Sequence, residues 1–378
     1  MRQRVLFIAV LLALVLPLSG CWDGVELQKR AIVLLLGIDP AEHGGVTVSV
    51  QIALPHKLGT ITSGEGGANQ GKTITVSQSG ASVGEAVHRI QLSVDRRLFF
   101  GHLQAVIVNQ QLARQGISPV LNPLVQSRIV PRNAWLCISF ASAEQITKFN
   151  PPTDPIPARY LTNFFTNDIL LDRPYEGSVG GFHQRLVTPG VEPYSFAVFA
   201  DDPSSSPRIH GLAVFQGNRL VGTLSHKLVL GWTFVENQCS RTVTDFRCPE
   251  GDGRFTVNIK SVHTDIRFPT AASGFQKVQI RTRLVGDIEG GICARLQSTS
   301  RRKQLERAVS KQVQTFVRES LATSQRRWGT DIFGLGLTLY RQHPDQWPGD
   351  KQWRKQFRSL KFDIKADARL HYVQTYNV

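Results

Sequence analysis

The stretch AIVLLLGID, residues 31–39, is the first of three runs that together predict one β-sheet. VTVSVQIALP at 46–55 and KTITVSQSG at 72–80 follow it, and all three runs are rich in β-branched residues. Such residues favour the pleated backbone of a strand, and the runs partly alternate between apolar and polar side chains. We therefore expect three strands of a single sheet near the start of the chain.

A helix is expected directly after the third run. Ser82-Val83-Gly84-Glu85 is a capping box, in which the serine and the glutamate bond the first free N–H groups of a helix. LQAVIVN at 103–109 and AWLCISF at 134–140 predict two more strands, and SAEQITKF predicts a helix that begins at Ser142. Strands that alternate with helices are typical of an α/β fold.

The second half of the chain is expected to be β-rich until one long helix begins. DDPSSSP at 201–207 predicts a linker, and the segment 211–224, GLAVFQGNRLVGTL, predicts a hairpin. Two strand-like runs follow at 254–268 and 277–290. A long amphipathic helix is expected from Arg301, because apolar residues recur along one stripe: Leu305, Val309, Val313, Phe316 and Leu321. The alternating run at 359–373 predicts a half-exposed final strand.

The first residues resemble a bacterial lipoprotein signal. Arg2 and Arg4 precede twelve apolar residues, a run too short for a transmembrane helix, which needs about 20. Leu18-Ser19-Gly20-Cys21 then matches a lipobox, so residues 1–20 are expected to be removed and Cys21 to carry a diacylglyceryl thioether. Two acyl chains suffice for stable anchoring in a membrane. The alternative is an ordinary secretory signal in which the cysteine is accidental.

The charge balance points to an anionic surface outside the cytoplasm. After residue 20, 42 Lys and Arg face 29 Asp and Glu, and sixteen of the basic residues lie within 301–369. An exported, anchored chain has little access to nucleic acid, so lipid phosphates are the expected counter-charge. Four residues form a basic cluster around Trp353 and Phe357, which should pack inward: Lys351, Arg354, Lys355 and Arg358. This cluster is expected to face phospholipid head groups or an acidic partner, the alternative being a solvated face that only aids solubility.

The cysteines and histidines give no sign of a metal or redox site. No Cys-x-x-Cys occurs, and the ten histidines show no metal-binding spacing. Cys137 is expected to be a buried apolar side chain, while Cys239 and Cys248 could close a short disulfide loop. His102 precedes a strand, where it could bond loop carbonyls or contact a partner. No cofactor is expected.

Two sequence patterns suggest catalysis but have structural explanations. Gly66-x-x-x-x-Gly71-Lys72-Thr73 satisfies the P-loop pattern, yet a strand follows it where a nucleotide site needs a helix. Gly80-x-Ser82-x-Gly84 satisfies the nucleophile-elbow pattern, but Ser82 already serves as the expected helix cap. We therefore expect a polar loop and a capped helix, and no enzyme activity.

Several segments, in order along a lipobox-bearing chain, resemble the Ger(x)C family, the lipoprotein C subunits of spore germinant receptors. The resemblance covers nearly the whole chain after the signal and rests on these segments: Cys21-Trp22-Asp23 with Glu26-Leu27, Gly37-Ile38-Asp39, Gly80 to Ala86, Arg97-Leu98-Phe99 with Gly101-His102, Gly211 to Phe215, Leu220-Val221-Gly222, Asp331-Ile332-Phe333-Gly334, and Pro344, Trp347, Trp353 and Phe357.

The resemblance implies a mixed α/β fold of three domains, each a sheet flanked by helices. Combined with the element pattern, it suggests a signal peptide at 1–20, an α/β domain at 21–200, a β-rich domain at 208–270 and a C-terminal domain at 271–378. It further implies a non-enzymatic subunit on the outer face of the inner spore membrane, assembled with membrane A and B subunits. Candidate partner contacts are Gly101, His102, Asp331, Phe333 and Gly334. The alternative function is a substrate-binding lipoprotein of a transporter.

Overall fold

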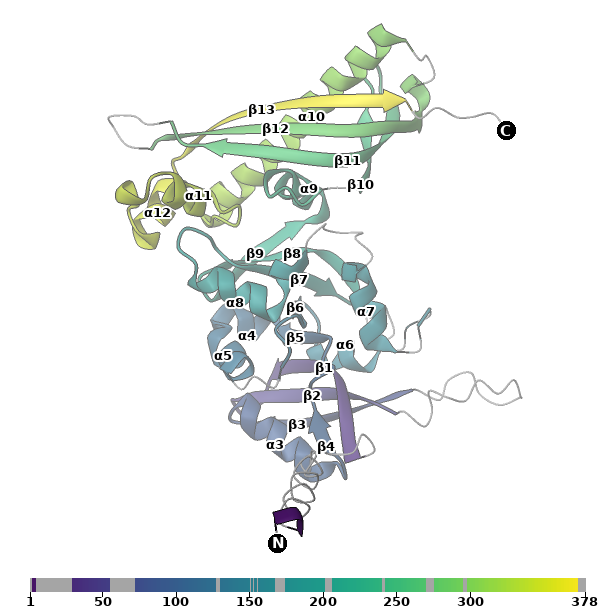
Figure 1. Ribbon diagram of the computed structural model, residues 1–378, viewed down its shortest axis with the longest axis vertical. Helices are drawn as coiled ribbons and strands as arrows, with labels where there is room; N and C mark the ends of the chain where they lie inside the picture. Colours follow the sequence, from purple (N-terminus) through teal and green to yellow (C-terminus); the bar gives the residue numbers. More distant parts are fainter. Residues whose placement is uncertain are drawn as a thin grey trace, which may run out of the picture.

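The structure consists of two β-sheets arranged along one elongated molecule (Figure 1). It is a computed structural model, and its described residues are 2–4, 29–54, 72–126, 130–149, 151, 153–154, 156–166, 174–200, 206–239, 242–269, 275–294 and 298–372. The mixed α/β class expected from the sequence is confirmed, with helices flanking each sheet.

The first sheet has nine strands, in the order β3-β2-β1-β5-β6-β7-β8-β9, with β4 beside β1. Its central strands β1, β5, β6 and β7 are parallel, and the outer strands are antiparallel. Both Leu35 and Leu36 are fully buried, so both faces of β1 are covered, which explains its continuous apolar sequence. The strands are β1 Arg30–Pro40, β2 Val46–Ala53, β3 Thr73–Gly80, β4 Arg97–Phe99, β5 Ala105–Asn109, β6 Trp135–Ser139, β7 Tyr194–Phe199, β8 Arg208–Gln216 and β9 Arg219–Ser225.

Helices cover both faces of this sheet. Buried side chains of α3, α4, α5 and α8 share one apolar core with Leu36, whereas those of α6 and α7 share the other with Leu35. The helical segments are α3 Val83–Ser93, α4 Gln110–Gln115, α5 Ser118–Gln126, α6 Ala143–Lys148, α7 Pro157–Thr166, η3 Pro174–Gly177 and α8 Val179–Val187.

The second sheet has four strands, in the order β10-β11-β12-β13, and the long helix α10 packs against it. Alternate residues of β12 are buried, as expected for a sheet with one covered face. The predicted stripe of α10 is buried at Leu305, Val309, Val313 and Leu321. Bounds are α9 His226–Val235, β10 Thr242–Arg247, β11 Arg254–Arg267, β12 Lys277–Gly291, η4 Ile292–Ala294, α10 Thr299–Thr323, η5 Ser324–Trp328, α11 Leu335–Gln342, η6 Pro344–Gln346, α12 Asp350–Phe357 and β13 Lys361–Tyr372.

The expected helix start at Ser82 is confirmed, with one difference in the hydrogen bonds. The Ser82 hydroxyl accepts the N–H of Glu85 at 3.2 Å. The Glu85 carboxylate reaches one residue further back than a standard capping box, to the N–H of Ala81 at 2.8 Å. Ser142 likewise caps α6. These local hydrogen bonds fix where two helices begin.

The sheets do not follow the expected segment boundaries. Strands β8 and β9, expected to open a separate middle domain, extend the first sheet because β8 pairs with β7, Tyr194 opposite Val214. The expected boundary near residue 270 falls between β11 and β12, which pair from Phe255 to Arg267. The described residues therefore form two sheets where three were expected. Where the chain would divide into independently folding units stays a prediction.

The disulfide differs from the suggested one. Cys248 is bonded to Cys293, 45 residues later, and this bond ties β10–β11 to the segment after β12. Cys239 and Cys137 are buried and take no part in this disulfide. The short spacing between Cys239 and Cys248 was misleading because proximity in sequence does not place two Cβ atoms at bonding distance.

Replacing Ser82 tests whether it is a helix cap or a nucleophile. Ser82→Ala should lower the free energy of unfolding by about 1 kcal/mol, because a Glu85 N–H loses its acceptor. Ser82→Thr is the matched control and should restore most of the stability in denaturant titrations. Hydrolysis of a model ester by the wild type that disappears in both variants would contradict the cap.

Removing the disulfide tests the Cys248–Cys293 pairing. Cys248→Ala and Cys293→Ala should each lower the free energy of unfolding by about 4 kcal/mol, the chain-entropy value for a loop of this length. The double variant should be scarcely less stable than either single variant, because both remove the same bond. Additive losses in denaturant titrations would show that the two cysteines are independent.

Candidate functional site

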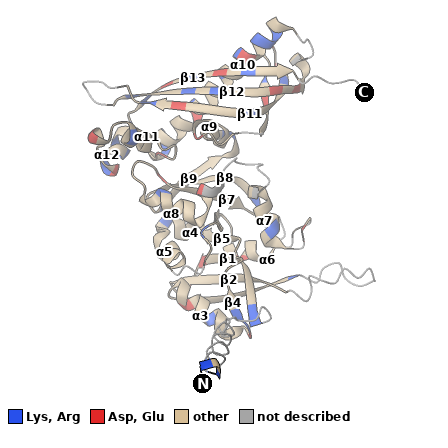
Figure 2. Cartoon of the chain, viewed as in Figure 1, with Lys and Arg blue, Asp and Glu red and all other residues tan. Residues whose placement is uncertain are grey.

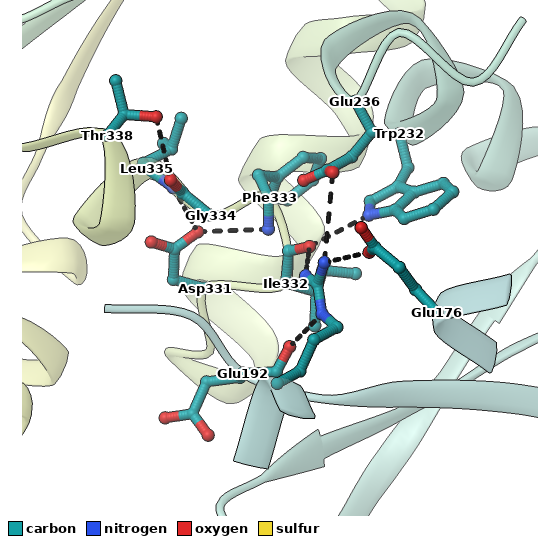
Figure 3. Close-up of polar contacts among 11 residues, drawn as sticks. Glu176, Glu192, Trp232, Glu236, Asp331, Ile332, Phe333, Gly334, Leu335 and Thr338 are labelled. Carbon is teal, nitrogen blue, oxygen red and sulfur yellow. Dashed lines mark hydrogen bonds and ion pairs between the residues drawn. The ribbon is translucent and has the colours of Figure 1, made fainter. Parts of the chain in front are cut away.

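The turn Asp331–Gly334 lies inside the molecule, where the first sheet meets the helices of the second (Figure 3). Asp331 and Phe333 are 2% and 3% exposed, so their contacts are internal. This differs from the partner contacts expected for them. Gly334 is half-buried and has a left-handed backbone, φ +64°, which favours glycine. The turn is therefore a buried junction rather than an open surface.

Asp331 organises this turn with both of its carboxylate oxygens. Oδ1 accepts the N–H groups of Phe333 at 3.1 Å and Leu335 at 3.2 Å. Oδ2 accepts the N–H of Gly336 at 2.8 Å and the indole N–H of Trp353 at 3.0 Å. Burial raises the pKa of Asp331 to about 6, although these four donors oppose the rise. The carboxylate thus starts α11 and holds α12 against it.

Arg185, from α8 of the first sheet, reaches into the same junction and is 7% exposed. Its Nη2 donates to the carbonyl of Ile332 at 2.7 Å, and its Nε donates to the carbonyl of Glu192 at 3.2 Å. Nη1 bonds the carboxylate of Glu176. The guanidinium also lies 4.9 Å from the ring centre of Tyr194. One cation therefore connects α8, the strand β7 and the Asp331 turn.

Glu236, directly after α9, is the least satisfied member of the junction. Its Oε2 lies 4.0 Å from Nη1 of Arg185, and its buried Oε1 has no hydrogen-bond partner among the described residues. Burial raises the pKa of Glu236 to about 8, despite the opposing charge of Arg185. Burial also lowers the pKa of the Arg185 guanidinium, but the charges of Glu236 and Glu176 outweigh it and hold that pKa above its ordinary value. Arg185 is therefore charged at neutral pH, and its charge opposes the rise in the pKa of Glu236.

The backbones of the two halves also approach closely beside the junction. Gly190 has φ +73°, and a Cβ there would lie 2.3 Å from the carbonyl carbon of Gly336. Leu337 donates its N–H to the carbonyl of Gly190 at 2.8 Å, and Glu192 donates its N–H to the carbonyl of Asp331 at 2.9 Å. These bonds hold the loop before β7 against the turn before α11. Only glycine at position 190 lets the two backbones come this close.

The expected basic cluster on α12 is only partly free. Arg354 donates to Glu192 Oε1 at 2.5 Å, and Arg358 donates to the carbonyl of Trp328 at 3.0 Å. Lys351 and Lys355 are exposed. Trp353 and Phe357 pack inward, as expected. Arg354 and Arg358 thus bond other segments of the chain, although Arg358, like Lys351 and Lys355, is exposed.

Gly101 and His102 lie at the other end of the molecule, in the turn after β4, and both are exposed. The His102 ring stands edge-on to Phe99 with centroids 5.7 Å apart. A Cβ at Gly101 would lie 2.4 Å from the same phenyl ring. The structure therefore does not bring these two residues together with Asp331 and Gly334.

Some expectations fall outside what the structure describes. Cys21 lies outside the described residues, so its acylation stays a prediction. Within the described ranges, no helix has both the length and the apolar character needed to cross a bilayer. The same ranges contain no cluster of three or more His, Cys, Asp or Glu suited to a metal ion.

The sequence analysis missed Arg185 and Glu236. A weak signal was present for the arginine, which lies three residues after Phe182 and therefore on the same apolar face of α8. For Glu236 there was none, because its burial depends on segments about 50 to 100 residues away. The arrangement provides no paired nucleophile and base. It is a buried junction in which Arg185 bonds groups from both halves of the chain.

The stability of the protein should fall as pH rises, because of Glu236. Its folded-state pKa of about 8 is above the ordinary 4.5, so between these values the folded state holds a proton that the unfolded state has lost. Stability contributed by this proton is complete below pH 4.5 and is lost as pH rises through 8. Glu236→Gln should flatten the profile, measured by denaturant titration at several pH values, by up to about 1.4 kcal/mol per pH unit.

The exposed Glu42 offers a matched control for this substitution. Glu42→Gln changes the same functional group and should leave the slope intact. Because Asp331 also has a raised pKa, of about 6, the comparison is made above that pH. Equal slopes for wild type and Glu236→Gln above pH 6 would contradict a protonated Glu236.

Two family models cover most of this chain. Residues 23–198 match the family described as "Spore germination protein N-terminal domain". Residues 210–373 match "Spore germination B3/ GerAC like, C-terminal". The boundary between the two matches falls within the hairpin connection from β7 to β8.

Full-length relatives and a solved structure agree with these matches. Spore germination protein KC of Bacillus subtilis is 24% identical over 97% of this chain and 95% of its own length. Spore germination protein B3 of the same organism is 23% identical, over 94% and 95%. The crystal structure of the GerBC protein aligns with a TM-score of 0.56 and 19% identity, over 89% of this chain and 96% of that one, which shows a shared fold. The chain belongs to the Ger(x)C family of spore germination proteins.

Proposed function

We propose that this protein is the lipid-anchored, non-enzymatic C subunit of a spore germinant receptor, which assembles with membrane A and B subunits. The observation that carries the proposal is the end-to-end match to spore germination protein KC, over 97% of this chain and 95% of the relative. The match thus compares nearly the full length of this chain with nearly the full length of that relative.

Three features support a structural rather than a catalytic role. The Ser82 hydroxyl is occupied as a helix cap. Asp331 is 2% exposed, and the Glu236 side chain, 14% exposed, lies 4.0 Å from Arg185 in the same junction. Arg185, their cationic neighbour, bonds two backbone carbonyls of the chain itself. These groups hold the two halves in one arrangement. A subunit that supports or transmits a signal needs such a fixed arrangement.

The anchor is proposed at Cys21, on the outer face of the inner spore membrane. Only eight residues separate Cys21 from Lys29, where the described fold resumes. The first sheet therefore starts close to the bilayer, while the second sheet lies at the opposite end of the molecule (Figure 1). This placement favours an acidic partner subunit, rather than lipid, opposite the exposed Lys351 and Lys355 of α12.

One observation favours the second candidate, a substrate-binding lipoprotein. A hollow of about 1230 Å³ opens at the carboxyl ends of β1 and β5, the position where α/β folds commonly bind ligands. Asp39 in this hollow accepts N–H groups of Ala143 and Glu144 at 2.8 Å, however, so its carboxylate is already occupied by α6. Calorimetric titration with amino acids and sugars distinguishes the candidates: saturable binding favours the transporter protein.

Removing the anchor cysteine tests the proposed attachment. Cys21→Ala should abolish the diacylglyceryl mass and move the protein out of the membrane fraction, since no thioether can form. An uncleaved leader could itself retain the chain, so a second variant joins residue 22 onward to an ordinary secretory leader. Normal melting of the released protein is the control for folding. Persistence of the acyl mass in Cys21→Ala would contradict the anchor.

A further inference from the structure

We propose that the end of the first sheet made by α3, β4 and the following turn lies against an anionic phospholipid bilayer. We call this surface the basal face and define it by His88, Leu92, Arg96, Arg97 and His102. The proposal rests on the proposed anchoring at Cys21 and adds a second, non-covalent contact with the membrane. It concerns a different surface from the basic cluster of α12.

The basal face presents an apolar side chain that no packing explains. Leu92, in the last turn of α3, is 76% exposed. His88 precedes it by one helical turn on the same side of α3 and is also exposed. A single exposed leucine is ordinary in a soluble protein. This one is followed within five residues by two arginines, and an apolar side chain beside basic residues is the combination that suits a lipid interface.

Two residues of the basal face, His88 and Arg97, border a hollow. Arg97 of β4 is exposed, and with His88, Gln91 and Gly101 it borders a hollow of about 700 Å³ between α3 and β4. Arg96 is half-buried. Asp95, the residue directly before it, is acidic and exposed. Arg30, whose guanidinium lies 4.5 Å over the Phe99 ring, lines the same hollow. Figure 2 shows the resulting concentration of blue at α3 and β4.

The position of the chain's entry brings this face close to lipid. Arg30 lies opposite Arg97 in the parallel pairing of β1 with β4, so the fold begins at the basal face itself. Cys21 precedes Lys29 by eight residues, which can span at most about 28 Å. An acylated Cys21 therefore keeps Arg97 and Leu92 near the bilayer. That proximity, together with the positive charge, favours a lipid surface over an acidic protein as the occupant.

Depth-dependent quenching of a fluorophore tests the contact in the full acylated chain. Leu92→Cys carries an NBD label, and Val243→Cys on β10, 56% exposed at the other end of the molecule, carries the matched control label. The vesicles contain spin-labelled lipid as quencher, in phosphatidylcholine with or without phosphatidylglycerol. We expect strong quenching at position 92, increased by phosphatidylglycerol, and none at 243. The native Cys137 and Cys239 are buried and should escape labelling.

Charge removal tests the role of the arginines. Arg96→Gln with Arg97→Gln should lower the quenching at position 92, whereas the matched pair Lys351→Gln with Lys355→Gln should not. In the unacylated chain from the secretory-leader variant, the arginine pair should weaken partitioning to phosphatidylglycerol vesicles about 25-fold, at roughly fivefold for each basic residue near the surface.

Flotation with the vesicles separates the two proposals. A chain that floats but shows no quenching at position 92, or equal quenching at 243, is anchored without the basal contact, and the basal face is then wrong. A chain that does not float refutes the anchor, and the unacylated partitioning experiment then decides the basal face alone. If Arg96→Gln with Arg97→Gln leaves partitioning to the vesicles unchanged, the proposed contact of the basal face is wrong.

Discussion

The buried guanidinium of Arg185 is the constraint on which the arrangement of this molecule depends. Removing a charge from water costs several kcal/mol, which only close and well-oriented partners can offset. Here the partners come from separate segments: the Ile332 carbonyl, the Glu192 carbonyl and the carboxylate of Glu176, with the carboxyl group of Glu236 4.0 Å away. Displacing any of these segments would leave the charge unsatisfied. These contacts therefore restrict how the two sheets can be placed relative to each other, because a small displacement would break them.

The junction around Arg185 gives a physical basis for a receptor subunit that acts through its structure and not through catalysis. The first sheet begins nine residues after the proposed anchor, and the second carries exposed basic residues at the far end of the molecule. The junction is one route by which a contact at one end can reach the other, and an apolar core shared by both sheets is a second. Burial raises the pKa of Glu236 to about 8 and that of Asp331 to about 6, so both carboxyl groups of the junction can change charge near neutral pH. The junction thus combines fixed backbone contacts with two titratable groups.

Local chemistry predicted much of the fold but little of this junction. Ser82 and Ser142 marked two helix starts, because a serine hydroxyl can bond an N–H only three residues away. The continuous apolar run of β1 and the apolar stripe of α10 were likewise visible in the sequence, because each reflects local backbone geometry. Asp331 attracted notice through family resemblance, yet its burial and its bond to Trp353 could not be inferred. Arg185 carried only a weak signal, its place on the apolar face of α8, and Glu236 carried none, because burial by distant segments leaves no mark on the neighbouring sequence.

The sequence by itself determined the α/β class, most strands and helices, the lipobox motif and the family resemblance, because each of these depends on residues close together in the chain. Only the tertiary structure decided how the strands divide into sheets, since β8 joins β7 across a segment whose composition predicts a break. It also decided that Cys248 pairs with Cys293 and that Arg354 and Arg358 face inward contacts. These outcomes depend on which surfaces meet after folding, and the energy of such contacts comes from burial and pairing between distant segments, which no local pattern encodes.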